Sequence, residues 1–392
     1  MSNYLLAVCS ESISGVNNHI RLFGHNDWRE LDDKLLTIPV SNFIRGCAFS
    51  SNGELLIIVH AGAGTQFMRV FDATSDWSVV SGTPTLPNTG FGCCYSNDES
   101  LFAVAHAVEK RISVFNTSDW TGIDDLPTLP NTAYGVAFSP NDEYLAIAHA
   151  NGNRLTILDT SDWSIIPGTP SLPWTAEDVH FSPNGDYLAV AHSNGRNFSV
   201  INTSDWTVNT SVPTMSGSSF GCHFSSDGSY LAVAHANSPN LTILNTSDWS
   251  TFHGMPTISS GAGNKCRFSP DDKYLAVTRL SNPRLRIIDT SDWSVVAEPV
   301  MPTGCTGVAF TDNPIVNKIS GKIYDKNGDP CERLIYLTTR QAPPRLLYST
   351  QSHPVTGEYD FTLISSDEVS RIVVSEDDSP VLNDIIDRVI PG

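Results

Sequence analysis

The chain is poor in basic residues and has no long apolar segment. Its 392 residues include 23 Lys and Arg against 42 Asp and Glu, a formal net charge of −19. A surface this acidic repels phosphate backbones, so we expect no nucleic-acid partner. No apolar run reaches the roughly 18–20 residues of a membrane-spanning helix, so we expect no membrane insertion. The first residues, MSNYLLAVCSES, lack the basic and long apolar regions of a secretory signal.

The eight cysteines are not spaced as a metal site or a disulfide framework. No two form a CxxC pair, and the spacings suit neither a zinc site nor a small disulfide-rich scaffold. One repeat position, filled elsewhere by Val136, Val179 and Val308, holds Cys47, Cys93, Cys222 and Cys266. A position that accepts Cys or Val favours a small buried apolar group. We therefore expect free thiols in the core and folding in a reducing cytosol.

Enzyme signatures are absent as well. The sequence contains no HExxH, GxSxG, GxGxxG or GxxxxGK[ST] pattern, the local motifs of zinc proteases, serine hydrolases, dinucleotide-binding folds and P-loop proteins. We therefore expect a protein that is not an enzyme, without catalytic residues, cofactor or metal.

A Ser-Asp-Trp or Asn-Asp-Trp motif recurs with a period of about 43 residues, which is typical of four-stranded propeller blades. Between motifs the chain alternates short strand patterns with turn residues, and no segment has the period of an amphipathic helix. The motif tryptophans are Trp28, Trp77, Trp120, Trp163, Trp206, Trp249 and Trp293.

Counting the strands by type predicts how the repeats close. Seven first strands end in an aromatic residue, from Phe49 to Phe310, and seven second strands begin between Tyr4 and Tyr274. The chain thus starts with a second strand and ends its repeats with a first strand. We expect an all-β, seven-bladed β-propeller with one-plus-three strand closure, which leaves no exposed sheet edges at the junction.

The repeats resemble those of a known superfamily. SPNGDYLAVAH followed by FSVINTSDW is similar to the repeats of seven-bladed WD-repeat and YVTN-type propellers. The resemblance covers about residues 1–314. It implies the fold and says little about function, because propellers host many unrelated tasks.

Two sets of repeated residues are expected to be structural. The aspartates of the Thr-Ser-Asp-Trp turns can bond their own backbone, and each tryptophan can pack against the neighbouring blade. Adjacent sheets lie about 10 Å apart, too far for equivalent imidazoles to share a metal ion, so we expect buried histidines bonded to the loop above their strand. These histidines are His60, His106, His149, His192 and His235.

Candidate functional residues lie where the repeat is broken. Most blades carry Ala just before the terminal aromatic of the first strand, whereas three consecutive blades carry His or Arg. Because first strands line the axial channel, we expect a polar and charged channel wall. Two interpretations remain open: a hydrated wall without ligand, and a contact site for a ligand or partner. The candidate residues are Trp174, Glu177, Asp178, His180, His223, Lys265, Arg267 and Arg279.

A second domain is expected at residues 315–392, after a propeller at 1–314. Short alternating strands indicate a small antiparallel β-sandwich. Its opening resembles the SGxVxDxxGxP pattern of transthyretin-like, carboxypeptidase-regulatory-type domains, here Ser320, Gly321, Ile323, Asp325, Gly328 and Pro330. The ending DRVIPG is similar to the ends of small β-domains in virion proteins of tailed bacteriophages.

These resemblances suggest a non-enzymatic structural protein of a phage particle, in a tail, neck or head-surface appendage. The propeller would display or adhere to a host receptor, and the C-terminal domain would bind other virion proteins or sister copies in a homo-oligomer. The protein would be made in the host cytoplasm and reside in the virion. One alternative is a cytosolic bacterial scaffold that binds a protein through the long loops Ser10–Asn18 and Ala61–Gln66. Another is a lactonase-type enzyme using Glu177, Asp178, His180 and His223.

Overall fold

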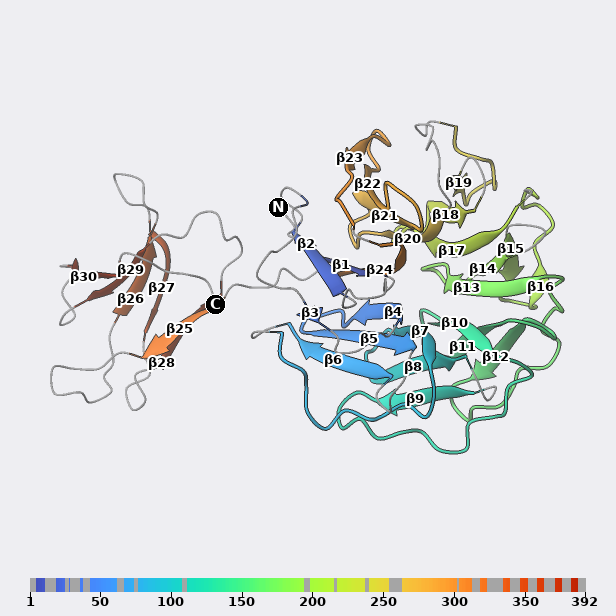
Figure 1. The fold of residues 1–392 in the computed structure, drawn as a ribbon, viewed down its shortest axis with the longest axis horizontal. Coiled ribbons are helices and arrows are strands. Elements are labelled where there is room, and N and C mark those ends of the chain that lie inside the picture. Colours follow the sequence, from blue (N-terminus) through green and yellow to red (C-terminus); the bar gives the residue numbers. More distant parts are fainter. Residues whose placement is uncertain are drawn as a thin grey trace. The chain divides into compact units, whose positions relative to one another are not determined.

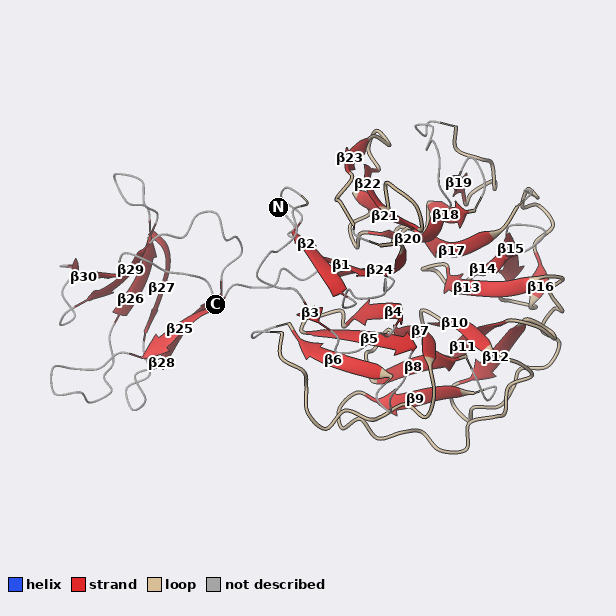
Figure 2. Cartoon of the chain, viewed as in Figure 1, coloured by secondary structure: helices blue, strands red, loops and turns tan. Residues whose placement is uncertain are grey.

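The computed structural model contains only β-strands as regular structure. It describes residues 5–10, 19–24, 28, 36–37, 43–61, 67–73, 77–107, 111–193, 198–214, 217–236, 240–253, 263–301 and 303–311, and in the last part of the chain 318–322, 334–338, 346–351, 358–362, 371–375 and 382–386. Among these residues there is no helix, as Figure 2 shows, and hence none that could cross a membrane.

The chain divides into two compact units. The larger consists of Tyr4–Asp72 and Trp77–Asp312, and the smaller is formed mainly by Asn313–Gly392. The two long loops named above, at residues 11–18 and 62–66, lie outside the described residues, as do Cys331 and the DRVIPG ending.

Seven antiparallel sheets of three or four strands make up the larger unit in the part of the chain that the structure describes (Figure 1). The first strands of these sheets are β4 (Phe43–Phe49), β7 (Gly90–Tyr95), β10 (Ala133–Phe138), β13 (Thr175–Phe181), β17 (Ser219–Phe224), β20 (Gly263–Phe268) and β24 (Cys305–Thr311). The second strands are β1 (Leu5–Ser10), β5 (Leu55–Ala61), β8 (Leu101–His106), β11 (Tyr144–His149), β14 (Tyr187–Ser193), β18 (Tyr230–His235) and β21 (Tyr274–Arg279).

The outer strands complete each sheet. The third strands are β2 (His19–Gly24), β6 (Met68–Asp72), β9 (Ile112–Asn116), β12 (Leu155–Asp159), β15 (Phe198–Asn202), β19 (Leu241–Asn245) and β22 (Leu285–Asp289). Three sheets have a short fourth strand, namely β3 (Leu36–Thr37), β16 (Thr207–Val208) and β23 (Val295–Ala297). In the other four sheets a single bridge takes its place, as between Phe71 and Val79.

The ring closes through a sheet built from both ends of the larger unit. β24 pairs antiparallel with β1, with Phe310 opposite Leu6, and the sheet order is β24-β1-β2-β3. Each first strand also contacts the first strands of the two neighbouring sheets, from β4 through β20 to β24 and back to β4. The predicted all-β class and propeller-like fold are therefore confirmed, and the expected one-plus-three pairing is present.

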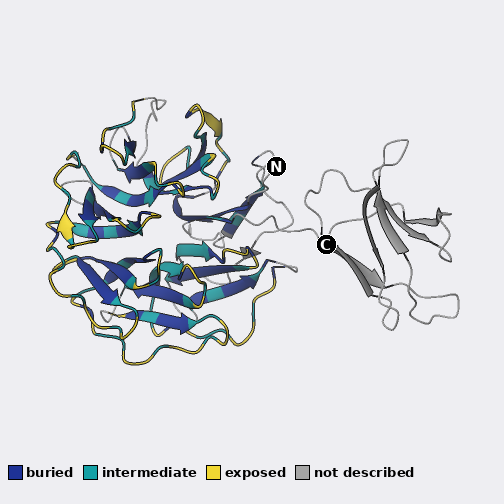
Figure 3. Ribbon diagram, turned by 180° about the vertical axis from the view of Figure 1, so that it is seen from behind, coloured by how far each residue is buried: buried dark blue, intermediate teal, exposed yellow. Residues whose placement is uncertain are grey.

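Neighbouring sheets share their hydrophobic cores. One buried cluster combines Leu155 and Ile157 of one sheet with Val179 and Leu188 of the next, and the other clusters repeat this arrangement. Figure 3 shows the resulting burial of the second and third strands. Because each sheet buries both faces against its neighbours, no sheet is a separate folding unit.

A serine closes the hairpin between the first and second strands in six of the seven sheets. In one repeat the hydroxyl of Ser139 accepts a hydrogen bond of 2.9 Å from the amide of Tyr144, the first residue of the second strand. Ser50, Ser96, Ser182, Ser225 and Ser269 do the same in five further repeats. These buried serines fix the register between first and second strands, a role that was not predicted from the sequence.

The smaller unit is also antiparallel. Its strands are β25 (Lys318–Lys322), β26 (Leu334–Thr338), β27 (Leu346–Gln351), β28 (Glu358–Thr362), β29 (Arg371–Ser375) and β30 (Leu382–Ile386). β25 pairs with β28, and the other four form a sheet in the order β27-β26-β29-β30. The expected strands are thus present, and the sandwich assignment stays a prediction.

Candidate functional site

The seven first strands surround an axial channel that contains two hollows. The smaller, of about 140 Å³, is lined by Gly46, Gly92, Gly135 and Gly307 and their neighbours, and we call it the glycine hollow. The larger, of about 800 Å³, is lined by the aromatic residue that ends each first strand, and we call it the aromatic hollow. These aromatic residues are Phe49, Tyr95, Phe138, Phe181, Phe224, Phe268 and Phe310. Both hollows are lined by Cys47, Cys93, Val136, Arg267 and Val308, where they meet.

Most first strands carry a glycine three residues before the aromatic residue that ends the strand, because neighbouring first strands approach very closely at that position. A Cβ atom on Gly92 would lie 2.5 Å from the carbonyl oxygen of Tyr134, and one on Gly221 would lie 2.8 Å from that of Asn264. Both distances are shorter than any ordinary carbon–oxygen contact. Two of the seven first strands carry a charged residue at this position instead of glycine, namely Asp178 and Lys265.

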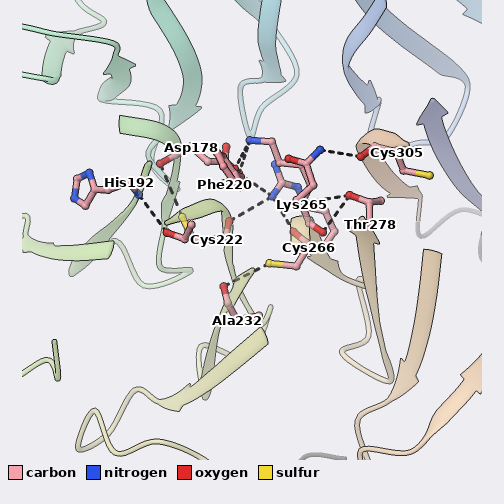
Figure 4. A network of polar contacts seen from close by, with 12 residues as sticks. Asp178, His192, Phe220, Cys222, Ala232, Lys265, Cys266, Thr278 and Cys305 are labelled. Atoms are coloured by element: carbon pink, nitrogen blue, oxygen red, sulfur yellow. Dashed lines mark hydrogen bonds and ion pairs between the residues drawn. The ribbon is translucent and has the colours of Figure 1, made fainter. Parts of the chain in front are cut away.

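Asp178 and Lys265 form an ion pair that spans an intervening blade (Figure 4). Asp178 is 6% exposed on β13, and its Oδ2 lies 3.3 Å from Nζ of Lys265 and 3.6 Å from Nη1 of Arg267, both on β20. Gly221, on the strand between them, leaves room for the Lys265 side chain, which also donates to the carbonyl oxygen of Phe220 at 2.7 Å.

The Asp178 carboxylate is stabilised mainly by electrostatic attraction to the two cations. Its Oδ2 atom has no hydrogen bond of good geometry. Burial raises the pKa of Asp178, but Lys265 and Arg267 outweigh burial and keep that pKa below its ordinary value. Asp178 is therefore an ionised counter-ion to two cations.

His180 and His223 stack on adjacent blades in the aromatic hollow. Their ring centroids are 4.0 Å apart with an interplanar angle of 36°. The amide of Phe224 donates to Nδ1 of His180, and the amide of Phe268 donates to Nδ1 of His223, each at 3.3 Å. Burial and Arg267 lower the pKa of His180 to about 3. Burial, His180 and Arg267 lower that of His223 well below its ordinary value.

These contacts limit the chemistry of the wall. An imidazole acts as a general base or binds a metal through an unprotonated nitrogen, and here the unprotonated Nδ1 atoms already accept amide protons. No group of three or more His, Cys, Asp or Glu suited to a metal ion occurs among the described residues. The wall instead presents hydrogen-bond donors and one excess positive charge.

The remaining candidates are more dispersed. Glu177 lines the glycine hollow and accepts a hydrogen bond from the Ser193 hydroxyl. Trp174 precedes β13 and is half-buried, and it lines neither hollow. Arg279 is fully buried at the end of β21. Arg279 occupies the position that the repeated histidines have in other sheets and lines neither hollow, so it is not part of the polar channel wall for which it was a candidate.

The repeated histidines are buried and bonded within their own sheet. Nε2 of His149 lies 2.8 Å from the Thr156 hydroxyl, and Nε2 of His235 lies 2.8 Å from the Thr242 hydroxyl. His106 and His192 have the same relation to a serine hydroxyl, while the ring of His60 lies against Phe67. Four of the repeated histidines thus pair with a hydroxyl of the third strand, and backbone groups of the segment before the first strand also lie close to His149 and His192.

The repeated tryptophans occupy an unusual backbone conformation. All seven have positive φ values, between 54° and 63°, which costs a non-glycine residue roughly 1–2 kcal/mol. The turn offsets this cost: Trp163 N–H donates to the Asp159 carbonyl at 2.7 Å, and the Asp162 carboxylate accepts from the Ser164 amide. The rings pack on the preceding sheet, as the Trp249–Tyr187 centroid distance of 5.0 Å illustrates.

The channel also contains residues that the sequence analysis missed. Arg45 lies in the glycine hollow with its guanidinium carbon 4.9 Å from the centre of the Phe91 ring, and Phe91 packs on Tyr134. The sequence does contain a signal for Arg45. The position directly before the repeated glycine, which is present in five of seven repeats, holds a different residue in nearly every repeat.

The described cysteines, seven in number, are free, and burial raises the pKa of Cys9 and Cys222 well above the ordinary value. Cys47 and Cys93 are only partly buried and line the channel, so their position is not purely a core position as expected.

Comparison with known proteins supports the fold. No protein-family model matches the chain, and no curated protein sequence matches it. The solved structure of Kuenenia stuttgartiensis hydrazine synthase matches with a TM-score of 0.57 and 16% sequence identity, over 68% of this chain and 89% of that chain. At this identity the likeness concerns the fold alone.

Proposed function

We propose that this protein is a non-enzymatic structural or interaction protein of a bacteriophage particle. The propeller-like unit is a rigid platform for display or host adhesion. The C-terminal unit anchors the protein to other virion proteins or to sister copies, and the assembled protein is a homo-oligomer of the virion.

The observation that carries the proposal is the pairing of a closed ring with a separate β-rich unit. A ring whose sheets bury both faces is suited to hold a surface rigid, and the division of the chain leaves Asn313–Gly392 as a second compact unit. The phage setting rests on the similarity of the DRVIPG ending to the ends of small β-domains in virion proteins.

The channel chemistry supports a binding role over catalysis. Asp178 is held as a counter-ion, and the Nδ1 atoms of His180 and His223 accept backbone amides. The residues considered for a lactonase-type reaction are thereby engaged in bonds to the ring itself.

Deletion of residues 315–392 tests the anchoring role. The truncated protein is expected to unfold in urea with the same tryptophan transition as the full chain, because all eight tryptophans precede residue 314. It should be absent from purified phage particles in a host that supplies no full-length copy. Incorporation at the level of the intact protein would refute the anchor, and recovery of the intact protein only in host cytosol would favour the scaffold alternative.

A further inference from the structure

The protons of the histidine pair are fixed by the backbone. A ring nitrogen that accepts a hydrogen bond from an amide carries no proton. Nδ1 of His180 and Nδ1 of His223 both accept such a bond, and both rings are neutral at pH 7 because of their lowered pKa values. Each ring therefore carries its proton on Nε2.

Both Nε2–H groups are available to the aromatic hollow. Within the described part of the chain neither Nε2 atom makes a hydrogen bond, and neither is among the buried side-chain atoms without a partner. Both rings line the aromatic hollow, so the accessible Nε2–H groups open onto it. Because the ring centroids are only 4.0 Å apart, the two donors can reach the oxygens of one bound anion.

Arg267 adds donors and charge to the same wall. Its Nη1 donates to the carbonyl oxygens of Cys222 and Cys266, at 3.3 and 3.0 Å, and lies 3.6 Å from Asp178 Oδ2. Its Nε and Nη2 are not among the buried atoms without a partner. Asp178 faces two cations, Lys265 and Arg267, so these three side chains together have one excess positive charge.

The rest of the aromatic hollow is apolar. Seven aromatic side chains surround it, with Ala48, Ala137 and Ala309 beside them. Among its described lining residues Glu99 is the one acidic side chain, and it accepts a hydrogen bond from the Ser51 amide. A ligand for this space needs an anionic group for one wall and an apolar body for the others.

We propose that the aromatic hollow binds a small organic carboxylate. The carboxylate accepts hydrogen bonds from Nε2–H of His180, Nε2–H of His223 and the guanidinium of Arg267, and the apolar body lies against the aromatic side chains. This site is separate from any anchoring function of the C-terminal unit, and its test does not depend on a phage particle.

Titration calorimetry on the full-length protein with benzoate tests the site. One benzoate should bind per chain with a Kd of about 1 mM, the range open to so small a ligand. Benzamide has the same shape without charge and should bind at least about tenfold more weakly, because charge-assisted hydrogen bonds are lost. Equal binding of benzamide, or no binding of benzoate, would overturn the proposal. Inorganic phosphate binding as tightly as benzoate would overturn the role of the apolar body.

Three variants locate the binding. R267Q should weaken benzoate binding at least about tenfold, and A48E should do so by placing a negative charge in the hollow without altering the Asp178 network. R45Q is the matched control, because it removes a guanidinium from the glycine hollow of the same channel and should change the Kd less than about twofold. Equal weakening by R45Q, or unchanged binding in A48E, would overturn the assignment.

Spectra of ¹⁵N-histidine-labelled protein give an independent measurement that requires no variant. Among the signals of the 11 histidines, His180 and His223 should each give an Nε2–H tautomer signal that persists at pH 5, and benzoate should shift both. Signals that do not respond to saturating benzoate would contradict direct contact, even if heat of binding were observed.

Discussion

Mild acid should destabilise the propeller-like unit through its repeated histidines. His149, His192 and His235 are each at most 1% exposed. Burial lowers the pKa of each to about 4 from an ordinary value of 6.5, although backbone groups near His149 and His192 act in the opposite direction. The folded ring therefore keeps these imidazoles neutral at a pH where the unfolded chain has already protonated them.

The sign and size of the effect follow from this difference. Stability is fully present above pH 6.5 and is lost as the pH falls from 6.5 towards 4, because the unfolded chain binds protons first. At pH 5.5 each histidine costs about 1.4 kcal/mol, and the three together about 4 kcal/mol. Near that pH each histidine makes the free energy of unfolding fall by about 1.2 kcal/mol for each unit by which the pH is lowered. A loss of this size is a large part of the stability of a typical domain, roughly 5–15 kcal/mol.

Urea unfolding followed by tryptophan fluorescence measures this loss between pH 7.5 and 5. All eight tryptophans precede residue 314, so the signal reports the larger unit. The H149Q variant should be less stable at pH 7.5 and should show a pH slope smaller by about 1.2 kcal/mol per pH unit. His253 is exposed, and H253Q is the matched control. A slope in H149Q equal to that of the unaltered protein would refute the reasoning.

Three further substitutions test the packing and the ion pair. W249A removes a ring that is 5% exposed and should cost about 3–5 kcal/mol of unfolding free energy; a cost below about 1 kcal/mol would contradict its role in joining sheets. G221A places a Cβ 2.8 Å from backbone atoms and should cost about 1–3 kcal/mol, whereas G122A, whose Cβ meets nothing closer than 3.8 Å, is the control with little effect. D178N should lower the free energy of unfolding in urea by about 1–3 kcal/mol, because the partly exposed cations Lys265 and Arg267 lose their counter-charge. This loss should be smaller at high salt. A loss that does not depend on salt would count against the electrostatic explanation.

The number and spacing of the repeats predicted the ring, because each sheet forms from strands and turns that are close together in the chain. The Thr-Ser-Asp-Trp turns place Trp163 and its equivalents at one backbone conformation, with φ near 60°. The alternating strands between turns are long enough to form one sheet per repeat. The pairing of β1 with β24 followed from counting strand types, since a sheet that lacked its first strand would expose an edge.

The candidate site was predicted only in part. The break in symmetry at His180, His223 and Arg267 did identify residues of the aromatic hollow. The sequence places Arg279 at the repeated-histidine position of a second strand, but it does not show which of these polar side chains faces the channel. The packing of the sheets buries Arg279 and leaves Arg267 lining both hollows.

The amino-acid sequence alone determined the sheets, their turns and the closure of the ring, since these depend on residues close together in the repeat. The tertiary structure decided which side chains meet around the axis. Lys265 reaches Asp178 across Gly221, and the backbone of each following blade sets the proton positions on His180 and His223. Such contacts arise only when first strands from distant parts of the chain are brought side by side, and so no local pattern encodes them.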